Sequence, residues 1–169
     1  ALQKSNPELK DIFFIGGFAS VHFRLDDPKA PWTNVKVRQA LSMAMNYQSI
    51  VKDFYLGHAE LYTNTTSMPE YKDLRVPMKD LPADVQELYS YNPTKAKQML
   101  ADAGYANGFT ISVVINPTFT DLMSILKNDW AKVGVTLNLD TKDIAVYTSI
   151  RSGRTAQDAL CRSQNLSIV

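Results

Sequence analysis

The sequence predicts an α/β fold in which a layered sheet is flanked by helices. Short extended runs rich in β-branched residues alternate with stretches whose apolar residues recur every three or four positions, in the order β, αα, α, β, α, β, α, β. The 169 residues are enough for one domain with a sizeable core, and 45% hydrophobic and 21% charged residues are close to the average of soluble globular proteins. We therefore expect residues 1–169 to form a single α/β unit.

The N-terminal part is expected to contain a strand, a loop and a helix. Residues 12–25, IFFIGGFASVHFRL, predict two short strands or one bent strand, and their Gly16-Gly17 pair favours a bulge or tight turn over a phosphate loop. Residues 26–32, DDPKAPW, carry two prolines and predict a connecting loop. A helix follows at about Asn34, and its inward residues would be Val37, Ala40, Leu41, Ala44 and Met45.

Asn46 is expected to cap a second helix that ends at Gly57. The inner face of this helix would be formed by Ile50, Val51, Phe54 and Tyr55. The periodic pattern then lapses over residues 58–91, where Ala83–Tyr89 is the one helical candidate. Long irregular segments in compact domains tend to be functional or disordered, so we treat 58–91 as an irregular insert.

A regular unit, YNPTKAKQMLADAGYANGFTISVVIN, occupies residues 91–116. Asn92 can cap a helix that starts at Pro93, and Gly104 can end it. The run Phe109–Ile115 then reads as a strand. Its largely apolar composition predicts that helices cover both of its faces.

The C-terminal part repeats the alternation of helix and strand. A helix is expected near Asp121–Val133, stopped by Gly134, and the strand VTLNLDT follows at 135–141. The inward residues of that helix would be Leu122, Ile125, Leu126, Trp130 and Val133. Asp143 can cap a further helix that ends at Gly153, before a last extended run from Asp158 to Val169. The inward residues of this further helix would be Ile144, Tyr147 and Ile150.

Charge and cysteine content exclude several classes of protein. With 18 basic and 17 acidic residues, no long-range field favours nucleic acid or an anionic membrane surface. Cys161 is the single cysteine, so an intrachain disulfide is impossible and a cysteine-based zinc site is implausible. No run reaches the 18 or more apolar residues of a membrane span, and the opening ALQKSNPELK does not resemble a signal peptide. We therefore expect either a cytosolic protein or mature or truncated material.

The sequence holds no catalytic motif. It lacks G-x-S-x-G, a P-loop, G-x-G-x-x-G and H-E-x-x-H, so we expect no enzyme activity and no cofactor. His22 and His58 are 36 positions apart, without an acid-rich constellation, and are expected to be surface or packed residues rather than metal ligands. Asp26-Asp27 precedes a proline and is expected to cap a turn. Cys161 is expected to be an inert packed thiol.

Four segments resemble one family, the extracellular solute-binding proteins of ABC importers in the peptide, nickel and oligosaccharide group. They are APWTNVKVRQALSMAMNYQSIV, YNPTKAKQMLADAGYANGFTISVV, WAKVGVTLNLDTKD and YTSIRSG. They occur in the order of the family and together span about residues 20–153. The resemblance implies one lobe, the second large lobe, of a type II periplasmic-binding-protein-like (cluster C) fold. It also implies that residues 1–169 are part of a longer two-lobed protein.

The resemblance also implies where ligand contacts lie. Arg24 falls at a position that faces the ligand in peptide-binding relatives, with a solvent-exposed strand-edge arginine as the equal alternative. Asp158 fits the aspartate at the start of the family's second cleft strand, and Cys161, Asn165 and Ser167 then fall on or near cleft-facing positions. No tryptophan and no amine-binding acid follow, which argues against a peptide with a free N-terminus. Asn46 stands where the family has aspartate, and asparagine caps a helix equally well.

The implied function is uptake of a small-molecule solute (peptide, oligosaccharide or nickel complex) by hinge closure, with a membrane permease as partner and no nucleic acid. The implied location is periplasmic or extracellular, with membrane association through a segment outside this chain. The alternative is a free-standing α/β domain that binds a partner protein through residues 58–91. A small enzyme that uses Asp26, His22 or Cys161 is a distant third, because no constellation supports it.

Overall fold

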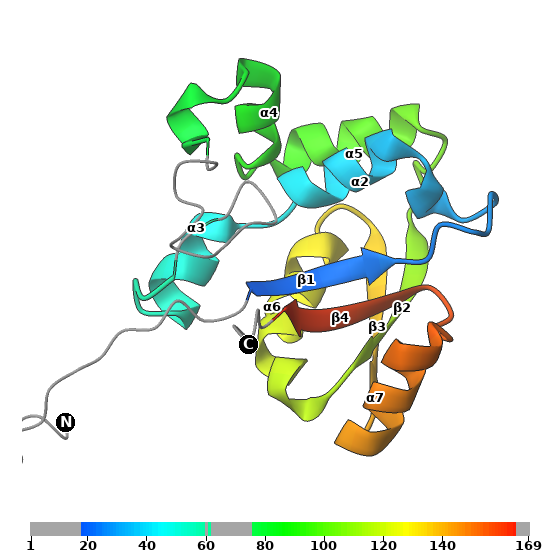
Figure 1. Ribbon diagram of the computed structural model, residues 1–169. Coiled ribbons are helices and arrows are strands. Elements are labelled where there is room, and N and C mark those ends of the chain that lie inside the picture. Colours follow the sequence, from blue (N-terminus) through cyan, green and yellow to red (C-terminus); the bar gives the residue numbers. More distant parts are fainter. Residues whose placement is uncertain (1–17, 60, 62–75, 165–169) are drawn as a thin grey trace, which may run out of the picture.

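The computed structural model describes residues 18–59, 61 and 76–164, and it has one four-stranded sheet (Figure 1). The strands are β1 (Phe18–Phe23), β2 (Phe109–Ile115), β3 (Val135–Thr141) and β4 (Ala159–Gln164). Their order in the sheet is β1-β4-β2-β3, with β1 antiparallel to β4 and β2 parallel to both β4 and β3. The expected α/β class is therefore confirmed.

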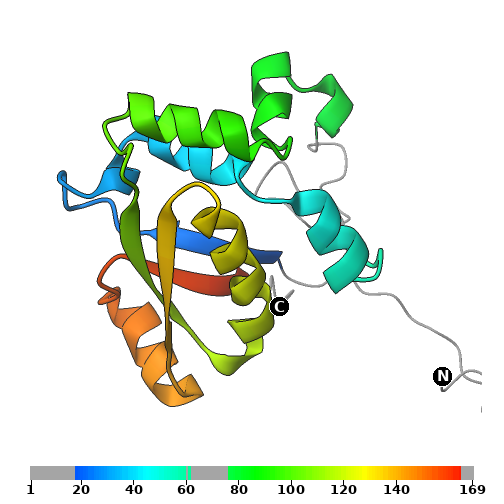
Figure 2. The same ribbon diagram turned by 180° about the vertical axis from the view of Figure 1, so that it is seen from behind.

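The helices follow the predicted order. They are α2 (Val35–Met43), α3 (Tyr47–Ser49) with a π-helical turn at Ile50–Phe54, α4 (Ala83–Leu88), α5 (Pro93–Asp102), α6 (Thr120–Ala131) and α7 (Ile144–Gly153). Short 3-10 turns occur at Pro31–Thr33, Met78–Asp80 and Pro117–Phe119. The helices α2 and α5 lie side by side, and α6 and α7 cover opposite faces of the sheet (Figures 1 and 2). Residues 12–17 and 165–169, which belong to predicted extended runs, lie outside the described residues.

The core lies between the α6 side of the sheet and the helices α2, α5 and α6. Strand alternation directs one set of β2 and β3 side chains to this side. Phe109 and Leu139 in this set are half-buried and Thr141 is exposed, whereas the others are fully buried (Ile111, Val113, Ile115, Val135 and Leu137). Trp130 is 2% exposed, and its indole N–H donates to the carbonyl of Leu41 at 3.0 Å, which ties α6 to α2. The buried faces of α2, α5 and α6 therefore form one continuous core. The predicted inward face of α6 is partly wrong, because Leu122 and Ile125 are only half-buried whereas Met123 is 1% exposed.

The predicted helix caps are present. Asn46 accepts a hydrogen bond from the backbone N–H of Ser49, and Asn92 accepts one from Lys95. Asp143 accepts from two backbone N–H groups, those of Ala145 and Val146, at 2.9 and 3.0 Å. These side chains satisfy donors that the first turn of a helix leaves unpaired.

An Asp143→Ala variant is expected to lower the free energy of unfolding by about 1 kcal/mol, because α7 loses both capping hydrogen bonds. Urea denaturation followed by circular dichroism measures the change. Asp121→Ala is the matched control, since Asp121 is also an exposed acid in the first turn of a helix but makes no capping bond. An equal loss in both variants would contradict the capping role.

Two predictions about the inward residues of the other helices are also wrong. Phe54 and Tyr55 are each 38% exposed, not inward, because the turn at Ile50–Phe54 is π-helical and shifts residues off the 3.6-residue period. Ile144 is 61% exposed at the first position of α7, where the helix has not yet reached the sheet. The helix α7 ends at Gly153 as predicted, and Arg154 follows as its C-cap in the left-handed conformation (φ 53°).

Strand β2 is not covered on both faces along its whole length. Thr110 is exposed and Ser112 is half-buried, whereas Val114 is buried. The reason is that β4 pairs with β2 only at Val113 and Val114, so α7 and β4 protect the C-terminal half of the strand. At Ser112 the backbone N–H instead donates to the carboxylate of Asp158 at 2.8 Å.

Candidate functional site

Arg24 is fixed at the point where β1 ends and β4 begins. Its backbone N–H donates to the carbonyl of Asp158 at 2.7 Å, and its own carbonyl accepts from the indole of Trp32 at 2.7 Å. The exposed guanidinium binds Asp26 through two parallel bonds of 2.6 and 2.8 Å. This bond from Arg24 holds the pKa of the Asp26 carboxyl below its ordinary value. A ligand that used Arg24 would therefore have to compete with Asp26.

The two aspartates before Pro28 have different roles. Asp27 caps the turn as predicted: its carboxylate accepts from the backbone N–H of Lys29 at 2.9 Å. Asp26 does not cap the turn, because its carboxylate forms an ion pair with the guanidinium of Arg24.

Cys161 lies in the middle of β4, opposite Val21, and is 1% exposed. Burial raises the pKa of its thiol to about 12. The expectation of a packed thiol is confirmed. A role of Cys161 in ligand contact stays a prediction, as do the roles of Arg24, Asn165 and Ser167.

The Cys161 thiol is expected to react with a thiol-specific disulfide reagent far more slowly in the folded chain than in 8 M urea. A pKa of about 12 instead of 9.0 lowers the thiolate fraction at pH 8 by about three orders of magnitude, and burial restricts access further. The rate of thionitrobenzoate release measures this difference. Rapid modification of the folded chain would show that Cys161 is more accessible than its packing indicates.

Arg24 and Cys161, the two predicted site residues that the structure describes, do not lie on the same face of the sheet. Val21 and Cys161 are directly paired and therefore share a face of the sheet. Arg24 follows Val21 by three residues along the extended chain, so Arg24 and Cys161 point to opposite faces of the sheet. Arg24 lies beside the start of β4, whereas Asn165 and Ser167 follow its end and lie outside the described residues. A strand of 6 residues is about 20 Å long, so Arg24 is distant from the point where β4 ends.

The carboxyl edge of the parallel strands is the part of an open α/β sheet that most often binds ligands. Two polar residues follow strands at this edge. Asn116 follows β2, is 9% exposed and accepts from the backbone N–H of Thr118 at 2.9 Å. Lys142 follows β3, and its backbone N–H donates to Ile115 at 2.8 Å. Sequence reasoning did not single out either residue, although a polar residue directly after a strand is a signal that it could have used.

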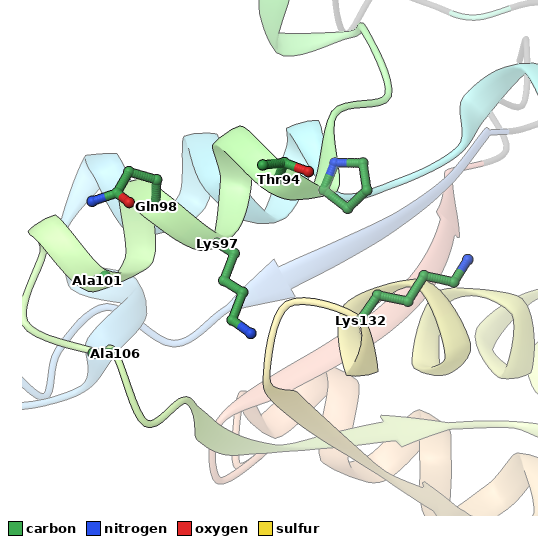
Figure 3. Close-up of a pocket in the computed structure, with 7 residues that line it drawn as sticks. Thr94, Lys97, Gln98, Ala101, Ala106 and Lys132 are labelled. Atoms are coloured by element: carbon green, nitrogen blue, oxygen red, sulfur yellow. The ribbon is translucent and has the colours of Figure 1, made fainter.

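A shallow groove of about 590 Å³ lies on the outer side of α5. Figure 3 shows its lining, which comprises Pro93, Thr94, Lys97, Gln98, Ala101, Ala106 and Lys132. Lys132 is engaged elsewhere, since its ammonium group binds Asp129 at 2.8 Å and donates to the hydroxyl of Tyr91 at 3.2 Å. No hydrogen bond pairs a nucleophile with a base among these seven described residues.

The two histidines do not form a metal site in the described part of the chain. His22 is exposed on β1 with its Nε2 atom 2.8 Å from the hydroxyl of Ser20, and burial, followed by Arg162, lowers its pKa. His58 is exposed after the π-helical turn. Within residues 18–59, 61 and 76–164, no three His, Cys, Asp or Glu side chains are grouped closely enough to hold a metal ion. In the same ranges, no helix combines the length and apolar character needed to cross a bilayer.

Comparison with known proteins identifies the family. The family model of the bacterial extracellular solute-binding proteins, family 5 (middle) matches residues 1–159. Heme-binding protein A of Haemophilus influenzae is 34% identical over 156 residues, which are 87% of this chain and 26% of that protein. The dipeptide-binding protein of Escherichia coli is 35% identical over 128 residues, which are 70% of this chain and 22% of that protein.

The solved structure of HbpA2 from Haemophilus parasuis superposes on 89% of this chain with a TM-score of 0.67 and 30% identity, and this covers 29% of that protein. The chain thus spans about a quarter of the length of the curated relatives that it matches. The family is one of solute-binding proteins rather than enzymes, in agreement with the lack of a catalytic motif. The match over residues 1–159 also agrees with the four segments that resemble ABC importer proteins, and we conclude that this chain belongs to family 5 of the bacterial extracellular solute-binding proteins.

Proposed function

We propose that residues 1–169 are one ligand-binding lobe of an extracellular solute-binding protein of an ABC importer, with residues 58–91 as an irregular insert. The lobe closes by a hinge motion with the rest of the protein over a peptide or another small polar solute, and a membrane permease accepts the closed form. The observation that carries this proposal is the match of residues 1–159 to the family model, combined with coverage of only 26% of a relative that is 34% identical.

The described residues suit a lobe that moves as one piece. Capped helices and a single continuous core make the body stiff, and the loops after β2 and β3 meet at one edge of the sheet. Lys142 is hydrogen-bonded to Ile115 across this edge, so the two loops are held at fixed positions. Such an edge can form one wall of a cleft, because ligand groups reach loop backbone and polar side chains there.

The solutes to test follow from the names of the relatives. Relatives are named for heme and for dipeptides, so both belong among the solutes to test, together with an oligosaccharide and a nickel complex. Localisation outside the cytoplasmic membrane, with attachment through a segment outside this chain, is part of the same proposal.

The test is to purify the full-length protein that contains this sequence and to identify by mass spectrometry the small molecule released on denaturation. Refolded protein is then titrated with that molecule and with a dipeptide, heme, an oligosaccharide and a nickel–histidine complex. Saturation at about 100 times the Kd is expected to stabilise the protein by about 2.7 kcal/mol, visible as a higher Tm. Absence of binding to every member of the panel, or catalytic consumption of the bound solute, would contradict the proposal.

The rival function, a free-standing domain that binds a partner protein, is less well supported because the family match extends over nearly the whole chain. It predicts that the 169-residue chain captures its partner without any other lobe.

A further inference from the structure

A cluster of basic and polar side chains lies on the face of β1 and β4 that is opposite to Cys161. Ser20 is paired with Arg162 and His22 with Leu160, and directly paired residues share a face. Residues two positions apart on a strand also share a face, so Ser20, His22 and Arg162 lie together. The hydroxyl of Ser20 is 2.8 Å from Nε2 of His22, and Arg162 is near enough to lower the pKa of His22, although burial has the larger effect.

The helix α7 brings a second arginine to this cluster. The hydroxyl of Tyr147 donates to the carbonyl of Cys161 at 2.7 Å and holds α7 against β4. Arg151 follows Tyr147 by four residues and therefore lies on the same face of α7. Burial raises the pKa of Tyr147, while both Arg151 and Arg162 act in the opposite direction. The charges of Arg151 on α7 and Arg162 on β4 thus act on the same tyrosine.

The positive charge of Arg162 has no counterpart in the described part of the chain. The ion pairs found there involve other cations: Arg24–Asp26, Lys95–Glu87, Lys132–Asp129 and Lys142–Asp140. The Nε atom of Arg162 is buried and has no hydrogen-bond partner among the described residues. A buried donor without an acceptor is rare in proteins because its lost contact with water is not replaced. An acceptor supplied from elsewhere would remove this cost.

We propose that Arg162, Arg151 and the Ser20–His22 pair form a binding site for a carboxylate group. The planar guanidinium of Arg162 offers two parallel N–H donors that match the two oxygens of a carboxylate, and Arg151 adds a second positive charge. The carboxylate comes either from a free solute or from an acidic side chain in the part of the full-length protein that this chain does not include. The second source rests on the proposed function, whereas the site itself does not.

The test follows the imidazole Cε1–H resonance of His22 in the 169-residue chain at pH 7 while sodium acetate replaces sodium chloride at constant ionic strength. Acetate is expected to shift this resonance with saturation. R162Q is expected to bind acetate about tenfold more weakly, whereas K127Q, which removes an exposed cation on α6 at the other side of the sheet, should bind it as the wild type does. If R162Q does not fold, R162K keeps the charge without the planar fork and is expected to weaken binding as well.

The same acetate titration of the full-length protein distinguishes the two sources of the carboxylate, a free solute and an acidic side chain of the protein itself. If acetate still shifts the His22 resonance there, the site is open to a free carboxylate. If acetate has no effect there but binds to the 169-residue chain, an acidic side chain of the same polypeptide occupies the site. A linear, non-saturating response in the chain, or an equal response in R162Q and R162K, overturns the proposal. Neither result depends on whether the full-length protein transports a solute. A failure of the proposed carboxylate site can therefore be distinguished from a failure of the proposed function.

Discussion

A Gly108→Ala variant is expected to be destabilised by more than about 4 kcal/mol, a loss large enough to unfold many single domains. Gly108 has φ +71°, and a Cβ atom added to it would lie 1.8 Å from the carbonyl oxygen of Gly134 and 2.7 Å from its carbonyl carbon. The two glycines lead into β2 and β3, which are paired from Phe109 and Val135 onward. The clash is therefore between two backbones, and relief would require the two parallel strands to separate.

Gly104→Ala is the matched control for this prediction. Gly104 also has a positive φ, +94°, but an added Cβ would meet nothing within 4 Å. Its expected cost is about 1 to 2 kcal/mol, the cost of left-handed backbone alone. Urea denaturation of both variants measures the difference in free energy of unfolding. Equal losses would show that the contact between the two turns is not as tight as the structure indicates.

An Asp129→Ala variant is expected to be destabilised by about 3 kcal/mol. Asp129 is 3% exposed on α6, and its carboxylate accepts from the backbone N–H of Asn46 at 3.0 Å and from Lys132 at 2.8 Å. The alanine variant leaves the Asn46 N–H without an acceptor at the start of α3 and leaves Lys132 without its anion.

Asp121→Ala provides the comparison on the same helix, because Asp121 is exposed and its removal should change stability by about 0.5 kcal/mol or less. Thermal and urea denaturation of the two variants are expected to differ by more than 2 kcal/mol, on the basis of these two values. A loss for Asp129→Ala no greater than that for Asp121→Ala would mean that the bond to Asn46 does not stabilise the packing of α6 against α3.

Local features of the chain were predictable because neighbouring residues determine them. The caps at Asn46, Asn92 and Asp143 use side chains that bond within three residues, and the strands Phe109–Ile115 and Val135–Thr141 occur with the predicted ends. Features that depend on distant residues were not predictable. Asp129 interacts with a backbone group 83 positions away, so no local pattern marks it as buried.

The candidate site shows the same limit. Whether Arg24 and Cys161 share a face depends on the register between β1 and β4, which pairs residues about 140 positions apart along the chain. Because Val21 is paired with Cys161, Arg24 and Cys161 lie on opposite faces of the sheet. The sequence alone could not supply that pairing. The ion pair of Arg24 with Asp26 was within reach of sequence reasoning, because residues two apart on an extended chain point the same way. Its consequence, competition with any ligand at Arg24, depends on the geometry of the turn.

The central claim is that this α/β body binds its solute only together with the remainder of a longer, two-lobed protein. Small-angle X-ray scattering of the full-length protein, with and without the solute identified by mass spectrometry, tests it most directly, with calorimetry of the 169-residue chain alongside. We predict that the solute lowers the radius of gyration of the full-length protein and that the chain alone shows no measurable binding. Binding of the solute by the chain alone at full affinity, with no compaction of the full-length protein, would contradict the claim.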